Sequence, residues 1–516
     1  MSGPTPYYVT TPIYYVNDAP HIGHAYTTLA CDVLARFMRL DGHRVKFLTG
    51  TDEHGQKVEK SAAAAGMDPQ EFTDRVSRNF RDLAAAMKFS NDDFIRTTEP
   101  RHIASAQAIW RALDASGQIY LGSYAGWYSV RDEAFYAENE LSDGPDGTKV
   151  APSGAEVDWV EEPSYFFRLS DWQDRLLDFY DRNPDFIAPE SRRNEVISFV
   201  KGGLQDLSVS RTSFAWGIPV PDNPDHIMYV WLDALTNYIT AVGYPDTESE
   251  DFSTYWPANL HMVGKDILRF HAVYWPAFLM AAGLEPPTRV FAHGWWTNEG
   301  QKISKSLGNV IDPHHLIDLY GLDPVRYFLL REVPFGNDGD FSHRAMVGRM
   351  NGDLANDFGN LAQRVLSMIQ RNCDARVPAP GAFEAADSAL LDRVGGLRER
   401  VRDALGGQAF HKALIAIWDV VGEANRYVDD QAPWTLRKTD PARMATVLYV
   451  LAETIRRLAL VTQPFMPDAM ARLLDQLGQP ETARGFAALD SALEPGTPLP
   501  KPEGVFPRFV EEAADG

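Results

Sequence analysis

Cysteine, long apolar runs and runs of basic residues are all scarce in this chain of 516 residues. Its two cysteines, Cys31 and Cys373, lie far apart in the sequence, which excludes a disulfide framework and a zinc site built from cysteine thiolates. No stretch of about 18 uninterrupted apolar residues occurs, so we expect no membrane-spanning helix. The first residues lack the features of a secretory signal or a transit peptide, so we expect a cytoplasmic protein.

Positive charge is also in deficit, because 49 lysines and arginines are set against 71 aspartates and glutamates, which gives a net charge of −22. Affinity for nucleic acid comes largely from neutralised phosphates, so this balance alone argues against RNA binding. The basic groups are short, for example Arg192 with Arg193 and Arg437 with Lys438. An RNA-binding function would need a local basic face on an acidic body. The length predicts three or four domains.

The most informative stretch is residues 20–24, Pro-His-Ile-Gly-His. It follows an apolar run, residues 7–15, that predicts a strand, and it opens a helical pattern that ends just before Gly42. His21 and His24 are three residues apart, so they share one face of the first helical turn. The free N–H groups and the positive end of the helix dipole favour a phosphate there. A pair of capping or surface histidines is the alternative interpretation.

A second polar motif lies much further along, at residues 300–309, and contains Lys302 and Lys305. Glycine and asparagine flank it, which predicts a mobile loop that brings two cations onto a triphosphate. A solvated surface loop is the alternative. The order of strand, His-Ile-Gly-His, helix and late Lys-Ile-Ser-Lys-Ser loop resembles the class I aminoacyl-tRNA synthetases, whose signatures are HIGH and KMSKS. Ile303 replaces the usual methionine and leaves both lysines in place.

Further motifs narrow the resemblance. They are residues 11–17, 50–55, 229–235, 264–266, 293–295 and 425–434. Together with the two signatures they resemble the methionyl-tRNA synthetase family over nearly the whole chain. The resemblance implies an enzyme that activates methionine with ATP to methionyl-adenylate and pyrophosphate. The methionyl group would then pass to the terminal adenosine of tRNA(Met), with release of AMP.

Strands and helices alternate over the first part of the chain, which predicts a parallel sheet with right-handed crossovers. Ligands of such sheets bind beyond the carboxyl ends of the strands, where Tyr15 and Asp52 fall along with the two histidines. After the strand at 7–15, we expect helices at 21–40, 69–88 and 100–116 and strands at 45–50 and 94–96. Residues 117–225 break the alternation, with strands expected at 126–130 and 135–136, a loop at 141–154 and a helix at 171–182.

We expect the parallel sheet to resume with strands at 228–231 and at 261–266 and to end with a strand at 290–296. Trp231, Ala234, Leu235 and Tyr238 recur at helical spacing, which a plain core stripe would also explain. From residue 312 the pattern is almost all helical. The expected helices are 312–320, 323–331, 344–372, 386–405, 408–430, 441–463 and 466–477. Pro433 and Trp434 break this pattern, and the tail from Pro495 should be extended or partly disordered.

The predicted fold is α/β: a Rossmann-like parallel-sheet catalytic domain, split by an inserted β-rich domain and followed by a mostly α-helical anticodon-binding bundle. We expect the first half of the catalytic domain at 1–116, the insert at 117–225 and the second half at 226–296. The Lys-Ile-Ser-Lys-Ser loop and a stem-contact region would occupy 297–348, and the anticodon-binding domain 349–516.

The resemblance also implies roles for single residues. The catalytic residues would be His21, His24, Lys302 and Lys305. ATP would be bound by His21, Gly23, His24, Lys265, Asp266, His293, Gly294, Trp295, Lys302, Ile303, Ser304 and Lys305. Methionine would be bound by Ile13, Tyr15, Asp52, Trp231, Ala234, Leu235, Tyr238, Ile267, Phe270, His271 and Trp275. Aromatic rings suit a polarisable thioether, and a buried tyrosine hydroxyl and a histidine could also hydrogen-bond weakly to the sulfur.

Asn360, Arg364 and Trp434 would read the anticodon, because unstacked loop bases are recognised by hydrogen bonds to their edges and by stacking. For Asn360 with Arg364 a surface pair is the alternative, and for Trp434 a core tryptophan. Mg²⁺ would enter with ATP. Some relatives carry zinc ligands in the insert, but residues 117–225 contain no cysteine, so we expect no zinc and no other bound metal. Some carry an extra C-terminal domain that binds tRNA and dimerises; this chain ends too early for one, so we expect a monomer.

Three other functions fit parts of this pattern. Another class I synthetase would show a large editing insert or a zinc–thiolate cage, and neither is evident. A nucleotidyltransferase that does not bind RNA would lack the bundle containing Asn360, Arg364 and Trp434. A non-catalytic RNA-binding relative would be expected to lose His21, His24, Lys302 and Lys305, which are all present.

Overall fold

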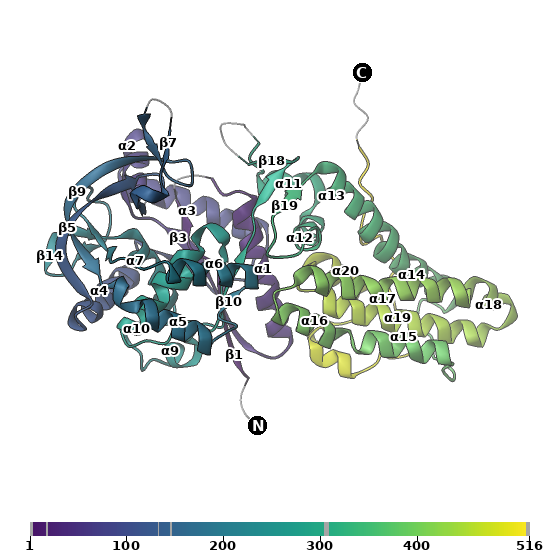
Figure 1. Cartoon of the computed structure of the whole chain (residues 1–516). Coiled ribbons are helices and arrows are strands. Elements are labelled where there is room, and N and C mark those ends of the chain that lie inside the picture. The colour runs from purple at the N-terminus through teal and green to yellow at the C-terminus, as the bar shows by residue number, and fades with distance from the viewer. Residues whose placement is uncertain (1–3, 17–18, 133, 145–146, 304–308, 512–516) are drawn as a thin grey trace, which may run out of the picture. The chain divides into compact units, whose positions relative to one another are not determined.

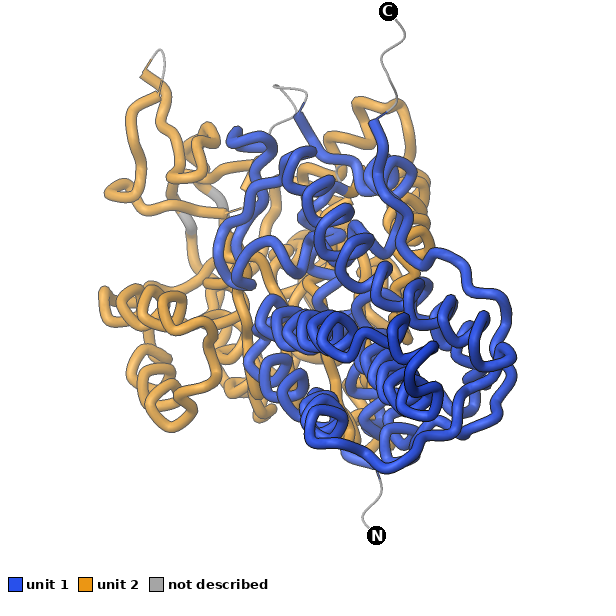
Figure 2. Tube along the Cα trace, turned by 90° about the vertical axis from the view of Figure 1, so that its right-hand side faces the viewer, with its two compact units in different colours: residues 1–5, 21–44, 294–516 blue, residues 6–20, 45–293 orange. Residues whose placement is uncertain are grey.

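The computed structural model describes residues 4–16, 19–132, 134–144, 147–303 and 309–511. The chain divides into two compact units, which Figure 2 shows in different colours. The sheet unit comprises Pro6–Pro20 and Val45–His293, and the helical unit comprises Met1–Thr5, His21–Arg44 and Gly294–Gly516. Along the sequence, the first signature motif therefore opens a segment of the helical unit, although the strands on either side of it belong to the sheet unit.

Seven strands of the described chain form one sheet with the order β10-β16-β15-β1-β3-β2, and β4 pairs with β3 (Figure 1). Their bounds are β1 (Pro6–Thr10), β2 (Tyr14–Tyr15), β3 (Arg44–Asp52), β4 (Asp93–Arg96), β10 (Ile187–Ala188), β15 (Leu260–Gly264) and β16 (Val290–His293). Pairing is parallel for β1 with β15, β15 with β16, β10 with β16, β2 with β3 and β3 with β4. This confirms the predicted parallel sheet. The strand expected at 7–15 is divided, because Pro12 has no N–H to donate to a ladder.

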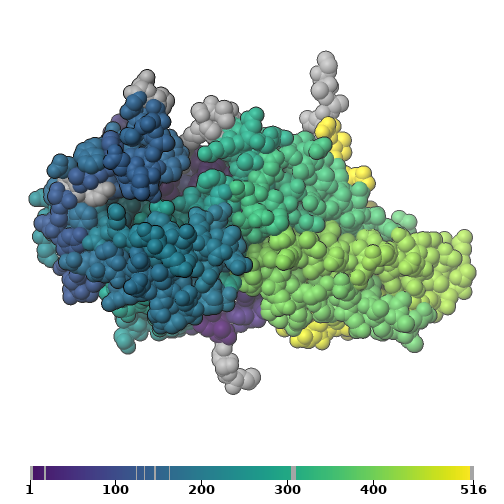
Figure 3. All heavy atoms as spheres, viewed as in Figure 1, coloured from purple at the N-terminus to yellow at the C-terminus, as the bar shows by residue number. Residues whose placement is uncertain are grey.

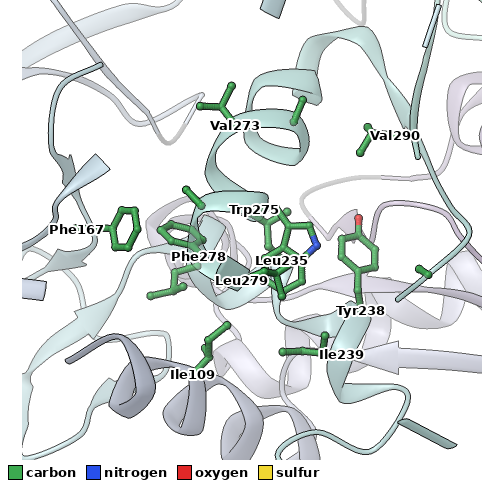
Figure 4. Packing of buried hydrophobic residues seen from close by; sticks show 14 of the residues in the cluster. Ile109, Phe167, Leu235, Tyr238, Ile239, Val273, Trp275, Phe278, Leu279 and Val290 are labelled. Atoms are coloured by element: carbon green, nitrogen blue, oxygen red, sulfur yellow. The ribbon is translucent and has the colours of Figure 1, made fainter. Parts of the chain in front are cut away.

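Helices of the sheet unit connect these strands and enclose an apolar core. They are α2 (Gln56–Ala64), α3 (Pro69–Ala86), α4 (Pro100–Ala115), α5 (Gln173–Arg182), α6 (Glu190–Lys201), α7 (Val230–Leu235), α8 (Asn237–Thr240), α9 (Glu250–Tyr255) and α10 (Trp275–Ala281). Short turns η3 (Leu169–Trp172), η4 (Lys265–Ile267) and η5 (Phe270–Tyr274) complete them. Figure 4 shows Ile109 of α4 and Phe278 of α10 in the core. Full burial of such a side chain stabilises the fold by about 1.5–3 kcal/mol.

The expected β-rich insert is present, with a longer ladder than its sequence predicts. Its sheet has the order β6-β5-β9-β8-β7, with β11 paired to β9. The strands are β5 (Ile119–Ser129), β6 (Ala134–Tyr136), β7 (Ser142–Asp143), β8 (Lys149–Val150), β9 (Glu156–Phe167) and β11 (Leu207–Ser208), and η1 (Glu138–Glu140) precedes β7. The loop expected at 141–154 thus contains an antiparallel pair, β7 with β8. Strands of two residues are too short to leave a periodic pattern.

Two expected strands of the parallel sheet are wrong. Residues 228–231 do not resume it: β14 (Asn223–Met228) belongs to a three-stranded sheet with β12 (Ser210–Arg211) and β13 (Pro219–Val220), and α7 begins at Val230. A short run of apolar residues fits a strand or a buried helix equally well. The last parallel strand ends at His293, and β17 (Trp296–Asn298) belongs to a sheet of the helical unit with β18 (Gln301–Lys302) and β19 (Gly339–Phe341).

The helical unit matches the predicted helical pattern closely (Figure 1). Its helices are α1 (Ile22–Leu40), α11 (Pro313–Tyr320), α12 (Leu322–Arg331), α13 (His343–Arg349), η7 (Met350–Gly359), α14 (Asn360–Asn372), α15 (Ala385–Gly395), α16 (Leu397–Gly406), α17 (Phe410–Gln431), α18 (Pro433–Thr439), α19 (Pro441–Thr462) and α20 (Pro467–Gln476), with η8 (Glu481–Ala483) and η9 (Phe486–Asp490) after them. In the space-filling view the later helices, green to yellow, pack without a visible gap (Figure 3). The tail is extended and buries Leu499 and Phe506.

Helix α1 is anchored inside the helical unit by a buried ion pair. Asp32 accepts a hydrogen bond of 2.7 Å from Arg326 of α12, and both side chains are fully buried. Arg326 also donates to the backbone oxygens of Pro464 and Phe465, so its charge is well solvated by the protein. At the far end Phe37 meets Phe486 edge to face. These contacts fix the helix whose first turn carries the two histidines.

Candidate active site

Expected ligand-binding residues lie at the carboxyl edge of the parallel sheet. Tyr15 pairs with Asp52 at the ends of β2 and β3, and Gly264 pairs with His293 at the ends of β15 and β16. Asp52 is 8% exposed and His293 is 4% exposed, so the fold holds both side chains closely. This is the edge beyond which parallel sheets bind their ligands, as the strand–helix alternation predicts.

Five rings of the expected methionine set lie together in the sheet unit; we call Trp231, Tyr238, Phe270, His271 and Trp275 the aromatic cage. Trp231 stacks on Phe270 with centroids 3.7 Å apart and 6° between the planes, and its edge approaches His271 at 6.2 Å. Tyr238 lies 5.7 Å from His271 and 6.1 Å from Trp275, beside which it stands in Figure 4. Tyr238, His271 and Trp275 are buried, and the stacked pair is half-buried. The set also has four aliphatic members. Leu235 is part of the same core, and Ile13 and Ile267 pack against it. Ala234 is buried as well but is not part of that core.

Hydrogen bonds fix the tautomer of His271. Its Nδ1 lies 2.9 Å from the carbonyl oxygen of Ile267, and a carbonyl only accepts, so Nδ1 carries the hydrogen. Burial lowers the pKa of His271 to about 4, so the ring is neutral at pH 7 and Nε2 is an acceptor. The Tyr238 hydroxyl, 2.7 Å away, therefore donates to Nε2. Both hydrogens are used within the protein. In this structure the two side chains bond to each other, and the expected hydrogen bonds to a sulfur stay a prediction.

The segment after Asp52 is held by dense polar contacts. Buried Glu53 accepts two hydrogen bonds from Arg96, of 2.6 and 2.8 Å, and two more from the hydroxyls of Thr51 and Thr98. His54 in turn contacts buried Asp233 at 2.6 Å. These contacts hold the chain segment that follows Asp52.

Sequence reasoning missed two buried charges close to these elements. Asp233 of α7 bridges His54 and His102, and Arg211 of β12 is 2% exposed. Within the described chain, Nε and Nη2 of Arg211 have no hydrogen-bond partner, and the guanidinium lies 4.7 Å from the ring centroid of Tyr229. No local pattern marks either residue, because each partner set is assembled from distant segments.

The sheet unit also contains three of the expected ATP-binding residues. Lys265 and Asp266 follow β15 directly in η4, and His293 ends β16. A Cβ atom at Gly264 would lie 2.5 Å from the Asp266 carboxylate, so a larger residue there would displace that carboxylate from its present position. Lys265 is half-buried and Asp266 is exposed.

In the helical unit, the two signature histidines together cap the N-terminal end of α1. His21 is the N-cap of α1, and its Nδ1 accepts a hydrogen bond of 3.1 Å from the Gly23 N–H. Nδ1 of His24 accepts one of 3.0 Å from the His21 N–H. In each neutral ring the hydrogen is therefore on Nε2. Burial lowers the pKa of His24 well below its usual value, and His21 adds to this. The capping interpretation is correct, and capping also aims two N–H donors.

The second signature is described only in part. Lys302 ends β18 and is exposed, with its ammonium 6.0 Å from the ring centroid of Trp295, and Ile303 is half-buried. Ser304 and Lys305 lie outside the described residues. A Cβ atom at Gly294 would come within 2.3 Å of the Asn337 carbonyl oxygen, so glycine is required there. Trp295 is 46% exposed, and its backbone N–H donates to Oδ1 of Asp338.

The expected anticodon residues lie close together in the helical unit. Asn360 and Arg364 are exposed or half-exposed on the first turns of α14. The Arg364 guanidinium is 5.6 Å from the ring centroid of Trp434 in α18 and donates to Asp429 at 2.8 Å. Trp434 is 47% exposed, so its interpretation as a core tryptophan is wrong. Ala432, in the left-handed region with φ 42°, ends α17 and turns the chain so that Trp434 projects.

No group of three or more histidine, cysteine, aspartate or glutamate side chains is arranged to hold a metal ion in the described part of the chain. None of the described helices is long and apolar enough to cross a membrane.

Comparisons with known proteins agree with this geometry. Residues 7–366 match the family of class I tRNA synthetases (M), and residues 377–516 match the anticodon binding domain of methionyl tRNA ligase. The methionine--tRNA ligase of Brucella suis is 60% identical, with 98% of each chain covered, and that of Rhizobium meliloti is 56% identical, with 100% of each covered. A structure of Mycobacterium tuberculosis methionyl-tRNA synthetase in complex with methionyl-adenylate superposes with a TM-score of 0.96 at 57% identity, over 98% of this chain and 100% of that one.

A split parallel sheet, a helical anticodon-binding region and the paired signatures define a class I aminoacyl-tRNA synthetase. The relatives cover this chain almost completely at 56–60% identity. The chain belongs to the methionine--tRNA ligase family.

Proposed function

We propose that the aromatic cage and Asp52 bind methionine for the two-step reaction of this family. Methionine and ATP give methionyl-adenylate and pyrophosphate, and the methionyl group then passes to the terminal adenosine of tRNA(Met). The aromatic cage is the observation that supports this most strongly. Stacked Trp231 and Phe270 with buried Tyr238 and Trp275 would contact the methionine side chain, and sulfur interacts well with aromatic rings.

The activation step needs charge placed at the right points and no protein nucleophile. The Asp52 carboxylate would hold the methionine ammonium, together with the backbone at Ile13. The methionine carboxylate attacks the α-phosphorus, and the pyrophosphate oxygen leaves with the bond electrons. Fixed Nε2–H donors of His21 and His24, with the cations Lys302 and Lys305, would meet charge as it grows on the phosphates.

The nucleotide would use the remaining residues of the predicted set. Lys265, Asp266 and His293 would bind the adenosine with Gly294 and Trp295, and Gly23 would let the phosphates approach the α1 backbone. Mg²⁺ would arrive as part of the Mg·ATP substrate. Ile303 and Ser304 would complete the set that binds ATP.

We also propose that Asn360, Arg364 and Trp434 read the anticodon of tRNA(Met). An exposed indole supplies a stacking face, and an arginine and an amide supply hydrogen bonds to base edges. The second attack, by a hydroxyl of the terminal adenosine on the adenylate, would then occur in the catalytic part.

The predicted domain plan stands as part of this proposal, with catalytic halves at 1–116 and 226–296, an insert at 117–225, a loop and stem-contact region at 297–348 and an anticodon-binding domain at 349–516. We further propose a zinc-free monomer that acts in the cytoplasm, where ATP, methionine and tRNA are available together. Sedimentation of the purified chain and metal analysis would test the first two points.

Replacement of the stacked cage rings tests the methionine assignment. We expect Phe270→Ala to raise the KM for methionine in aminoacylation of tRNA(Met) roughly tenfold or more, since the variant loses the ring that stacks on Trp231. The KM for ATP should stay within about twofold, because Phe270 is not among the residues proposed to bind ATP. An unchanged KM for methionine would contradict the assignment.

A further inference from the structure

A buried carboxylate that the reaction does not use directly joins three segments of the sheet unit. Oδ2 of Asp233 lies 2.6 Å from Nδ1 of His54, and Oδ1 lies 2.7 Å from Nε2 of His102. Asp233 and His102 have no exposed surface, and His54 is 5% exposed. These partners are 179 and 131 residues away in the sequence, so the contact is purely tertiary.

The protonation of this group follows from its partners. Burial alone would raise the pKa of Asp233, but His54 and His102 outweigh it and lower the pKa to about 2. The carboxylate is therefore ionised at pH 7 and can only accept hydrogen bonds. Both ring nitrogens that face it must then carry hydrogens, and the two contacts are charge-assisted hydrogen bonds, which are about twice as strong as neutral ones.

The three segments include those that carry the proposed methionine site. His54 lies two residues after Asp52, and Asp233 lies two residues after Trp231 and directly before Ala234. The third segment, α4, belongs to the core on which these elements pack. A single carboxylate thus connects the proposed ammonium acceptor to the helix that bears one half of the stacked pair.

Neighbouring hydrogen bonds join other pairs of elements. Glu53 fixes the Asp52 segment to β4 through Arg96. On the other side, the Tyr8 hydroxyl donates to the Tyr238 carbonyl oxygen, which anchors α8 to β1. Among the hydrogen bonds observed in the described chain, the one between His54 and Asp233 joins the Asp52 segment to α7.

We propose that Asp233, acting through His54 and His102, is a positioning residue that sets the separation of Asp52 from the aromatic cage and thereby the affinity for methionine. This inference rests on the proposed methionine site. Asp233 touches no substrate; it holds two binding elements in register. Its loss weakens binding of a ligand that must reach both elements at once and leaves the adenosine residues of η4 where they are.

Methionine-dependent exchange of pyrophosphate into ATP tests this with full-length variants. In Asp233→Asn the carboxamide presents an N–H to one of two ring N–H groups, so one contact is lost. We expect the KM for methionine to rise roughly tenfold, the effect of losing one hydrogen bond to a charged group. The KM for ATP should stay within about twofold, a split that a general loss of folded enzyme does not produce.

Variants at His54 separate positioning from folding. The amide nitrogen of asparagine can replace Nδ1 as a donor, so His54→Asn should keep the KM for methionine within about threefold, whereas His54→Ala should raise it roughly tenfold. Asp387→Asn is the matched control: Asp387 is a buried carboxylate of the helical unit that accepts from Tyr427 and twice from Arg443. It should lower stability and leave the KM for methionine unchanged.

The outcomes are distinct. An unchanged KM for methionine in Asp233→Asn and His54→Ala, or an equal rise in the KM for ATP, overturns the inference while wild-type exchange upholds the proposed function. If Asp233→Asn fails to fold, the His54→Ala and His54→Asn pair decides alone. If the wild type shows no methionine-dependent exchange, the proposed function fails and this inference fails with it.

Discussion

His21 combines a structural and a chemical task in one ring. Its Nδ1 caps α1, and the same hydrogen bond leaves the hydrogen on Nε2, where the proposed reaction needs a donor. In the proposed reaction the backbone and the phosphate would therefore use opposite edges of the imidazole. The same geometry is therefore compatible with two roles of His21, as a helix cap and as a catalytic donor.

Two substitutions separate the tasks of His21. Asparagine is among the best N-cap residues, so His21→Asn should keep the stability of the wild type, whereas His21→Ala should lose about 1 kcal/mol. Both should lower the rate of pyrophosphate exchange roughly a hundredfold or more, the usual effect of losing one donor that meets transition-state charge. Thermal unfolding and exchange kinetics of the two variants measure this. Restored exchange in His21→Asn would mean that capping is the whole role.

The aromatic cage predicts a pH dependence of stability. The pKa of His271 is about 4 in the folded chain, against an ordinary value of 6.5. Between these values the unfolded chain binds a proton that the folded chain excludes, so stability falls as the pH falls through this window, by up to about 3 kcal/mol at 1.36 kcal/mol per pKa unit. The variant His271→Gln has no imidazole at this position and therefore lacks this contribution to the pH dependence of stability.

Urea unfolding of the wild type and His271→Gln at pH 7 and at pH 4.5 tests that expectation. Burial also lowers the pKa values of His24 and His261 far below normal, but both proteins share those residues. The wild type should be the more stable at pH 7, and the gap between the two urea midpoints should narrow at pH 4.5. A constant gap would contradict a neutral His271 in the folded chain.

At the scale of elements, the contact between Arg364 of α14 and exposed Trp434 of α18 leads to a prediction about tRNA binding. Trp434→Ala should leave pyrophosphate exchange unchanged, because α18 carries none of the proposed catalytic residues. It should lower kcat/KM for tRNA(Met) roughly tenfold to a hundredfold, the range expected when one stacked base loses its platform. Phe383→Ala is the matched control, since Phe383 is 46% exposed in the same unit and Trp434 is 47% exposed. Equal charging by both variants at limiting tRNA would remove Trp434 from the anticodon site.

Elements with long periodic patterns are predictable from this sequence. Helix α1 begins and ends within one residue of its prediction, because an apolar stripe runs through it and Gly42 adopts the positive φ that ends it. The run at 228–231 is not predictable in this way, because four apolar residues fit a strand and a buried helix equally well, and β14 ends at Met228 while α7 begins at Val230.

The candidate site is predictable to a similar extent. Side chains at strand ends, such as Tyr15 and Asp52, follow from the alternation of strands and helices. The hydrogen bond between Tyr238 and His271 does not, since its geometry depends on a π-helical turn, η5, that places His271. Buried Arg211 and Asp233 could not be identified either, because their environments come from residues distant in the sequence.

At the scale of the whole molecule, the net charge of −22 makes tRNA binding depend on a few local cations. Arg437 and Lys438 are exposed in α18, the helix that carries Trp434. Contacts with phosphates release counterions, so the KM for tRNA should rise roughly tenfold or more between 50 and 200 mM salt. The KM for methionine should change less than about twofold, because buried groups are screened little. Steady-state charging at three salt concentrations measures both KM values. An equal rise of the two KM values with salt would contradict tRNA binding through local cations.

The most direct test of the central claim is exchange of pyrophosphate into ATP with each of the standard amino acids in turn, without tRNA. The aromatic cage and Asp52 predict exchange with methionine alone, at a rate that Phe270→Ala lowers at limiting methionine. Exchange with another amino acid in place of methionine would contradict the assignment of the cage. No exchange with any amino acid, from folded protein, would contradict the proposed catalytic function altogether.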